Sequence, residues 1–418
     1  MKIAILGHGV EGRSAEQYFK KQGNEVTVFD NFNFRDLPKF QLHQFDLIMR
    51  SPSLSPANIQ AAYPETLPLS SITKYFFEHC PAPIIGVTGT KGKGTTASII
   101  QAILKALGTK TWLVGNIGTP ALDILGQIQP SDTVIYELSS FQLWDLHQSP
   151  QVAVVLRIEP DHLDKHTSFD DYLQAKANIA KFQTATDTCI FYQNNSDSRK
   201  IAQLSAGTKL PYPTDNAAVL ELASSINLRG AHNQENAAAA IIAVAAAKKL
   251  ALDTFLTKYH NEISTALKNF HGLPHRLELV RTLNHVEYYD DNYSSAFPAL
   301  DVAVAAFHNR PTFLIAGGQD RQLDLSVTQN RLATAPNLQK IFLIGETAHQ
   351  LAKKQDSQKF IPVTSLTAAV QQAQITAEKL PPQSLPVVLM SPGAASFDMF
   401  QNFSDRGNQF QKIVQELS

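Results

Sequence analysis

The sequence predicts an α/β protein built from open, mostly parallel β-sheets. Three observations predict this class. Apolar, β-branched segments alternate with helical segments along the whole chain, two glycine-rich loops each follow such a segment, and further polar clusters come directly after other apolar segments. In parallel sheets of this kind ligands bind beyond the carboxyl ends of the strands, so the loops and clusters are the places where we expect a site.

The strand pattern divides the chain into three expected domains. Residues 1–82 predict a Rossmann-like domain with strands in KIAIL, EVTVF and DLIMR and a helix from about Arg13. Residues 83–271 predict a central parallel sheet like that of P-loop ATPases, with strands in IIGVT, TWLVG, TVIYE and VAVVL. Residues 272–418 predict a C-terminal Rossmann-like domain with strands in VEYYD, PTFLIAG, KIFLI and PVVLM, entered through a linker that starts at Asn269.

Composition excludes several classes of protein. The chain has 418 residues with 36 Lys and Arg against 37 Asp and Glu, so it lacks the basic surplus of a nucleic-acid-binding protein. Cys80 and Cys189 are its two cysteines, which argues against a disulfide framework and suits a reducing compartment. The longest apolar run, residues 237–247, is too short to span a bilayer. We expect a monomeric cytoplasmic protein with neither a nucleic-acid nor a membrane partner.

The glycine-rich loop after the strand at residues 84–88 is the strongest motif. Glycine amides and a helix N-terminus, which we expect near Thr95, point positive partial charge at an anion, and Lys93 adds a full charge. The loop departs from the strict P-loop pattern because Gly94 stands where Ser or Thr directly follows the lysine. The stretch still predicts a nucleoside triphosphate site, made of Gly89, Thr90, Lys91, Gly92, Lys93, Gly94, Thr95 and Thr96.

A second glycine loop, GHGVEG at residues 7–12, lies near the N-terminus. It follows a strand, opens a helix and has Asp30 at the end of the next strand, as in dinucleotide-binding folds. Alone it would favour a nicotinamide-dependent dehydrogenase. The same geometry can hold the diphosphate of a UDP-linked substrate, through residues such as Gly9, Val10 and Glu11, or can use its glycines for packing alone.

Several motifs occur together in a characteristic order. They are TGTKGKGTT at 88–96, GNIGTP at 115–120, YELSSFQL at 136–143, DHLDKH at 161–166, LQAKANI at 173–179, GAHNQEN at 230–236, GLPHRLE at 272–278 and SPGAASFDMFQNFSDRGNQF at 391–410. With both glycine loops, this set resembles the Mur ligase family over essentially the whole chain, and most closely its glutamate-adding members. The resemblance implies an ATP-dependent ligase that activates a carboxylate of UDP-N-acetylmuramoyl-L-alanine as an acyl phosphate and joins it to glutamate in peptidoglycan synthesis.

The resemblance also implies the catalytic residues. It places Mg²⁺ on Glu137 and His162 near the γ-phosphate, with Lys93 on the phosphates and Lys176 carbamylated by CO₂ to orient a second Mg²⁺. Composition alone would make Glu137 a surface acid, His162 a capping or packed histidine and Lys176 a solvated helix lysine. The GKG-T spacing resembles folylpolyglutamate synthases, in which the hydroxyl comes one residue later, and therefore predicts Thr95 as a metal ligand.

The remaining site residues come from the same resemblance. For ATP it implies Asn236, Arg276 and Asp291, whereas composition would make Asn233 and Asn236 helix caps. For the substrates it implies Gly9, Val10, Glu11, Asp30, Asn116, Ser139, Arg321, Ser396, Phe397 and Phe403, with core packing as the other reading of Phe403. The chain departs from the usual pattern at Tyr293, Ser295 and Arg157, and the sequence leaves D- and L-glutamate both open.

Other functions remain open at this level. A folylpolyglutamate-synthase-like ligase fits the phosphate loop, but the glycine-loop domain at residues 1–82 counts against it. Mur ligases that add a different amino acid or dipeptide share the expected ATP site. An NAD(P)-dependent oxidoreductase and a non-catalytic nucleotide-binding regulator are the more distant alternatives.

Overall fold

The computed structural model describes the chain except for residues 229, 295–296 and 321–323. It contains three sheets and divides into two compact units, Met1–Phe270 and His271–Ser418. The predicted α/β class with mostly parallel sheets is confirmed. Among the described residues no helix combines the length and the apolar composition needed to cross a bilayer.

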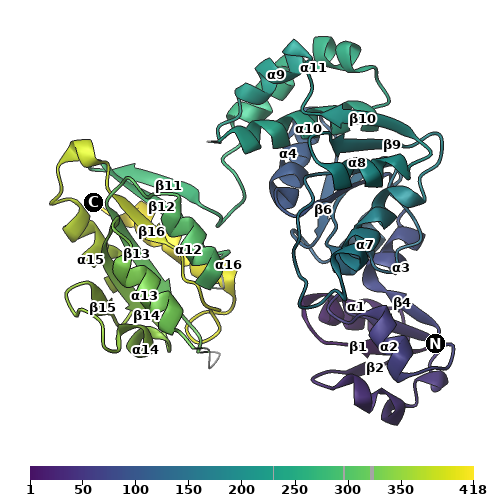
Figure 1. Ribbon diagram of the computed structural model, residues 1–418, viewed down its shortest axis with the longest axis horizontal. Coiled ribbons are helices and arrows are strands. Elements are labelled where there is room, and N and C mark those ends of the chain that lie inside the picture. The colour runs from purple at the N-terminus through teal and green to yellow at the C-terminus, as the bar shows by residue number, and fades with distance from the viewer. Residues whose placement is uncertain (229, 295–296, 321–323) are drawn as a thin grey trace. The chain divides into compact units, whose positions relative to one another are not determined.

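The first sheet has four parallel strands in the order β2-β1-β3-β4 and lies at the purple end of Figure 1. Its strands are β1 (Lys2–Leu6), β2 (Glu25–Phe29), β3 (Leu47–Arg50) and β4 (Leu69–Ser71). Its helices are α1 (Val10–Lys21), α2 (Pro56–Ala62) and α3 (Ile72–His79), with 3₁₀ turns η1 (Phe34–Phe40) and η2 (Leu42–Gln44). Helix α1 thus begins at Val10, earlier than the expected Arg13.

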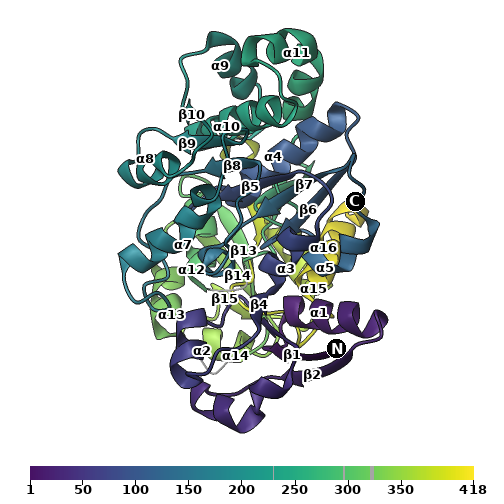
Figure 2. The same cartoon turned by 90° about the vertical axis from the view of Figure 1, so that its right-hand side faces the viewer.

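The central sheet has six parallel strands in the order β10-β9-β8-β5-β7-β6. The strands are β5 (Ile84–Thr88), β6 (Thr111–Gly115), β7 (Thr133–Glu137), β8 (Val152–Val155), β9 (Thr188–Tyr192) and β10 (Thr208–Tyr212). The helices are α4 (Lys93–Ala106), α5 (Ala121–Ile124), α6 (Ser140–Leu143), α7 (Phe169–Lys181), α8 (Ser196–Gln203), α9 (Ala217–Ser224), α10 (Ala231–Ala247) and α11 (Leu252–Lys268), with η3 at Leu125–Gln127. Figure 2 shows β5 and β7 inside this sheet, where every residue of both strands is buried.

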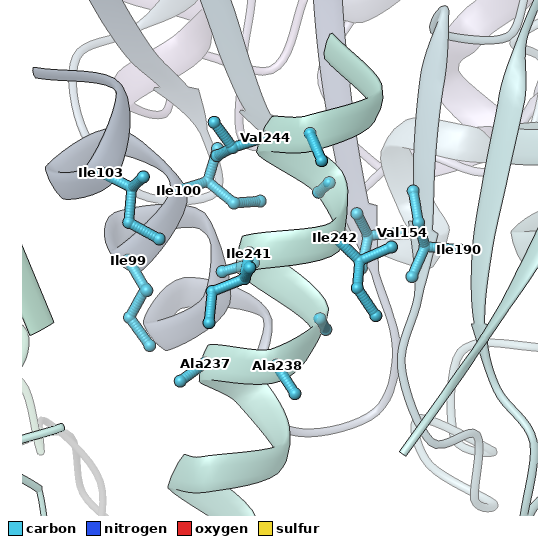
Figure 3. Packing of buried hydrophobic residues seen from close by; sticks show 14 of the residues in the cluster. Ile99, Ile100, Ile103, Val154, Ile190, Ala237, Ala238, Ile241, Ile242 and Val244 are labelled. Atoms are coloured by element: carbon cyan, nitrogen blue, oxygen red, sulfur yellow. The ribbon is translucent and has the colours of Figure 1, made fainter. Parts of the chain in front are cut away.

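Alternate residues of the central strands pack into two different cores. On one face, Ile85 and Val154 contact a cluster that includes α4 and the buried alanine-rich helix α10, whose Ile241 and Ile242 are labelled in Figure 3. A helix that is apolar on every side is stable only when it is buried all round, which explains the composition of α10. On the other face, Tyr136 belongs to a cluster that continues into the first sheet. This shared core makes residues 1–270 one compact unit.

The second unit contains a six-stranded sheet in the order β11-β12-β16-β13-β14-β15. It is parallel except for the antiparallel pair β11–β12. Its strands are β11 (Glu278–Leu283), β12 (Val286–Asp290), β13 (Thr312–Gly317), β14 (Leu338–Ile344), β15 (Phe360–Pro362) and β16 (Val387–Met390). Its helices are α12 (Phe297–Ala305), α13 (Ser326–Thr334), α14 (Ala348–Ala352), α15 (Leu366–Ala377) and α16 (Phe403–Glu416), with η4 at Pro382–Ser384.

The sequence pattern missed several short or edge strands. β11 begins in the stretch NFHGLPHRLELV, which the sequence pattern indicates as a linker, and the pattern does not indicate β4, β9, β10 or β15. β10 and β15 are edge strands that contain proline, which removes a backbone donor and weakens the strand signal. Helix α4 begins at Lys93, so the lysine belongs to the first helical turn rather than to the loop before it.

Candidate active site

The loop between β5 and α4 has the backbone of an anion cradle. Gly89 and Gly92 adopt positive φ values of 152° and 87°. A Cβ added at Gly89 would lie 2.6 Å from the Leu156 side chain, and one at Gly92 would lie 2.8 Å from the Asn236 Oδ1. Both positions therefore require glycine for conformation and for space. The loop ends at the N-terminus of α4, whose first-turn amides favour a bound anion.

Two lysine side chains meet at this loop. Lys93 Nζ donates to the carbonyl oxygens of Gly89 and Thr90, at 3.1 and 3.0 Å. Lys176 Nζ, from α7, donates to the same Gly89 oxygen at 3.0 Å and to the Thr88 hydroxyl at 3.3 Å. Lys176 is 1% exposed, so its interpretation as a solvated helix lysine is wrong. Burial and the Lys93 charge hold the pKa of Lys176 well below its usual range, against the opposite effect of Asp161 and Glu137.

The predicted residues Glu137 and Asn116 lie together beside this loop. Glu137 ends β7 and pairs in register with Val87 of β5. The Asn116 side-chain amide donates to Glu137 Oε1 at 3.0 Å, and the Asn116 backbone amide donates to the Glu137 carbonyl at 3.1 Å. Glu137 is 3% exposed, so it is not the surface acid that composition suggested. The sheet therefore delivers a fixed carboxylate next to the strand that leads into the phosphate loop.

The DHLDKH segment after β8 contains an exposed histidine and a buried one. His162 is exposed, adopts φ +54°, and its ring centre lies 5.0 Å from that of Phe141. His166 is 3% exposed, hydrogen-bonds the Ser140 hydroxyl at 2.9 Å and Asp171 at 3.1 Å, and stacks on Phe141. His166 thus anchors the turn that carries His162. Its position as the second histidine of the motif was the available sequence signal, and sequence reasoning missed it.

The hydroxyl and amide groups around the loop differ in exposure. Thr95 is half-buried, whereas Thr96 is fully buried and its hydroxyl has no hydrogen-bond partner among the described residues. Asn236 lies against Gly92, which places its side chain at the loop. Helix α10 begins at Ala231 after Gly230, so neither Asn233 nor Asn236 is its N-cap. Lys91 is exposed in the loop itself.

The first glycine loop contacts the segment that follows β7. Asp30 accepts a hydrogen bond from the His8 amide at 2.9 Å, which attaches it to the glycine loop. Glu11 Oε1 accepts from Gln142 Nε2 at 2.8 Å, and burial raises the pKa of Glu11 to about 7 although Gln142 and Arg50 oppose this. Val10 is 63% exposed, and Gly9 is also exposed.

Arg50, at the end of β3, is a further residue that sequence reasoning missed. It is fully buried, its Nε donates to Asp145 at 2.9 Å, and its Nη2 donates to the carbonyl oxygen of Phe141 at 3.2 Å. A charged residue closing the apolar strand LIMR was the available signal. Ser139 caps α6 and exchanges hydrogen bonds with Gln142. The segment from Glu137 to Asp145 therefore joins the neighbourhoods of the two glycine loops.

The second unit carries the remaining described candidates. Asp291 is 2% exposed, accepts from the Ser391 hydroxyl at 2.7 Å and from the Leu277 amide at 3.2 Å, and burial raises its pKa to about 6. The Arg276 guanidinium carbon lies 5.7 Å from the Tyr293 ring centre. These contacts hold Arg276 and Asp291 on neighbouring segments at the carboxyl end of β12.

The amino-acid candidates of the second unit differ in exposure. Ser396 is 2% exposed, and its hydroxyl has no hydrogen-bond partner within the described part of the chain. Phe397 and Phe403 are 64% and 41% exposed, so interpreting Phe403 as core packing is wrong. Arg321 and Ser295 lie outside the described residues.

The fold and the loop between β5 and α4 define the class of the protein: it is a parallel α/β protein with a P-loop-like anion cradle. A model of the Mur ligase middle domain matches residues 87–220. The UDP-N-acetylmuramoylalanine--D-glutamate ligase of Acetivibrio thermocellus is 33% identical over 468 aligned residues, covering 100% of this chain and 96% of the relative. The chain therefore belongs to the Mur ligase family, in the group that contains UDP-N-acetylmuramoylalanine--D-glutamate ligases.

Solved structures share the fold at low sequence identity. UDP-N-acetylmuramate-alanine ligase MurC from Thermotoga maritima superposes with a TM-score of 0.56 at 16% identity over 99% of both chains. Mycobacterium tuberculosis folylpolyglutamate synthase, solved with ADP, superposes with a TM-score of 0.54 at 12% identity over 83% of this chain and 94% of its own. At these sequence identities, both structures show a similarity of fold alone.

Proposed function

We propose that the protein is an ATP-dependent ligase that joins the carboxyl group of UDP-N-acetylmuramoyl-L-alanine to the amino group of D-glutamate. The names of full-length relatives at about 30% identity support these substrates. The observation that carries the reaction type is the convergence of Lys93 and Lys176 on the Gly89 carbonyl, beside the fixed carboxylate of Glu137. Positive charge at such a centre offsets the repulsion between ATP and a substrate carboxylate, so the centre suits transfer of a phosphoryl group from one to the other.

The reaction balances in two steps. The substrate carboxylate attacks the γ-phosphorus of ATP, giving an acyl phosphate and ADP. The glutamate amine then attacks the acyl carbon, loses a proton and expels inorganic phosphate, which leaves the amide. In this proposal the loop amides and Lys93 bind the β- and γ-phosphates and stabilise the charge that develops during transfer. ADP bound to a folylpolyglutamate synthase of the same fold supports ATP as the phosphoryl donor.

The donor groups fit Mg²⁺. Glu137 offers a hard carboxylate oxygen that Asn116 orients, and Thr95 offers a hydroxyl on the first turn of α4. We assign these two residues and His162 as ligands. Mg²⁺, when bound, neutralises charge on the phosphates and on the substrate carboxylate. A neutral imidazole is a softer ligand, so His162 is the least typical member of the set.

The substrate contacts divide between the three proposed domains, residues 1–82, 83–271 and 272–418. We assign the UDP-linked substrate to Gly9, Val10, Glu11, Asp30, Asn116 and Ser139. We assign ATP to the loop residues with Asn236, Arg276 and Asp291, and glutamate to Arg321, Ser396, Phe397 and Phe403. The near-neutral pKa of Glu11 lets this side chain approach a diphosphate as a neutral acid below about pH 7.

The function itself is tested by phosphate release from ATP in the presence of UDP-N-acetylmuramoyl-L-alanine and Mg²⁺. D-Glutamate is expected to stimulate phosphate release strongly. With L-glutamate, or without any amino acid, release should stay at the background rate. A Lys93→Ala variant supplies the background rate. Equal release with and without either glutamate would overturn the assignment.

Thr95 and Thr96 form a matched pair for testing the metal assignment. Thr95→Val removes a proposed ligand, and we expect kcat to fall by about 100-fold or more. Thr96→Val replaces a buried hydroxyl that has no described partner by a methyl group of the same shape, so activity and stability should be retained. Steady-state phosphate release and the urea midpoint measure both effects. A larger loss in Thr96→Val than in Thr95→Val would contradict the assignment.

Carbamylation of Lys176 is the third testable element. Burial lowers the pKa of the Lys176 amine, which favours its neutral form. The neutral amine would react with CO₂ to give a carbamate and release one proton. Lys176→Ala should therefore lose activity, and short-chain carboxylic acids such as formate or acetate should restore part of it. Lys181→Ala, on the exposed end of the same helix, is the control and should remain active. Full activity in Lys176→Ala, or no recovery with any acid, would refute the modification.

A further inference from the structure

A buried pair ties the entry segment of the second unit to the end of β12. His275 Nδ1 donates to Asp290 Oδ2 at 2.6 Å, and the two residues are 6% and 0% exposed. The hydrogen bond from His275 to Asp290 raises the pKa of His275 although burial opposes it. Burial alone would raise the pKa of Asp290, but hydrogen bonds from His275 and Asn292 lower it. Each partner therefore favours the charged form of the other.

This pair fixes two residues that the proposed function assigns to ATP. His275 directly precedes Arg276, and Asp290 directly precedes Asp291. His275 adopts φ +61°, a conformation that tertiary contacts must hold. Its ring lies against Gly407, where an added Cβ would overlap the ring nitrogen Nδ1. The turn that presents Arg276 is thus specified by contacts from β12 and α16.

The same carboxylate is connected to the loop that carries Ser396. Asn292 Nδ2 donates to Asp290 Oδ1 at 2.9 Å, and Asn292 Oδ1 accepts from Arg406 Nε at 2.6 Å. Arg406 in turn donates to the carbonyl oxygens of Ala394 and Ala395 at 3.0 and 3.4 Å. Asp290, Asn292 and Arg406 are each 0% exposed. A continuous buried chain of hydrogen bonds therefore runs from His275 to the residue before Ser396.

The cluster is a hydrogen-bonded network rather than a cation site. His275, Glu278 and Asp290 offer ligand-type atoms within 4.8 Å of one another. The Gln411 amide donates to both carboxylates, at 3.0 Å in each case. These N–H groups, with the His275 ring, supply the positive partial charge that the two acids require.

We propose that Asn292 is a positioning residue that couples the nucleotide contacts Arg276 and Asp291 to the amino-acid contact Ser396. The proposal rests on the roles given to those three residues above. Asn292 can do this because its amide donates on one side and accepts on the other. Neither an apolar side chain nor a carboxylate preserves both side-chain bonds. Substitution of Asn292 therefore interrupts the hydrogen-bonded connection between the Arg276 turn and the loop that carries Ser396.

Backbone amide exchange tests the coupling without reference to catalysis. In Asn292→Ala, exchange is expected to accelerate both at residues 275–277 and at residues 393–396. Asn337→Ala is the matched control, since Asn337 is 8% exposed and donates to the carbonyls of Val304 and Phe307 at 3.0 and 3.2 Å. It should accelerate exchange near residues 304–307 only. Acceleration at neither end, or at one end alone, in Asn292→Ala would overturn the proposal.

A second variant separates the two bonds. Asn292→Asp keeps the acceptor for Arg406 and the backbone N–H that donates to Asp290 Oδ1 at 3.0 Å, but it replaces the side-chain donor by a carboxylate oxygen that repels Asp290. Exchange should therefore accelerate at residues 275–277 and remain slow at residues 393–396. This variant also keeps the proposal testable if Asn292→Ala folds poorly. Acceleration at both ends in Asn292→Asp would contradict the assigned direction of the bonds.

Kinetics then connect the coupling to the reaction. Loss of a buried hydrogen bond to a charged group is expected to lower kcat/KM by about tenfold or more for ATP and for glutamate alike in Asn292→Ala. Asn337→Ala should leave both values near those of the wild type. A wild-type protein without glutamate-dependent phosphate release would refute the proposed function and leave the exchange result standing. An active wild type with Asn292→Ala impaired toward one substrate alone would refute the coupling.

Discussion

The candidate site depends on one electrostatic constraint: two lysine side chains donate to the same carbonyl oxygen, that of Gly89. An ammonium group as buried as that of Lys176 is stable only beside an anion, or if it loses its charge. The neighbouring residues meet this requirement. Glu137 supplies a fixed carboxylate, and the amides at the start of α4 are oriented to receive a phosphate. The proposed phosphoryl transfer and the proposed carbamylation are both responses to this surplus of positive charge.

The segment between Glu137 and Asp145 connects the first glycine loop to this centre, and in the proposed function it brings the second substrate there. Its first residue lies beside the phosphate loop, and its Gln142 reaches Glu11 in the first glycine loop. Arg50 and Asp145 tie the same segment to the end of β3. The shared hydrophobic core beneath these contacts joins the first two sheets into one unit. The sequence pattern, which separates residues 1–82 from 83–271, does not reveal this because side chains from distant segments form the core.

The features of the fold that the sequence predicts depend on patterns among residues close together in the chain. The phosphate loop, strands β5 to β8 and the α/β class follow from short-range patterns of glycine and of β-branched residues. Burial does not follow from such patterns. Lys176, surrounded in sequence by polar and small residues, is enclosed only because α7 lies against the phosphate loop. Arg50, His166 and Asn292 likewise acquire their contacts from partners far away in the chain, or from a turn whose geometry the sequence does not specify.

The central claim is that the γ-phosphoryl group of ATP passes to a substrate carboxylate. It is tested most directly with UDP-N-acetylmuramoyl-L-alanine labelled with ¹⁸O in its carboxyl group. During turnover with ATP and D-glutamate, one labelled oxygen should leave in each inorganic phosphate, because the acyl–oxygen bond of the acyl phosphate breaks when the amine attacks. Mass spectrometry of the phosphate measures this transfer. Phosphate that carries no label from the substrate would show that water, rather than the carboxylate, attacks ATP, and would contradict the account.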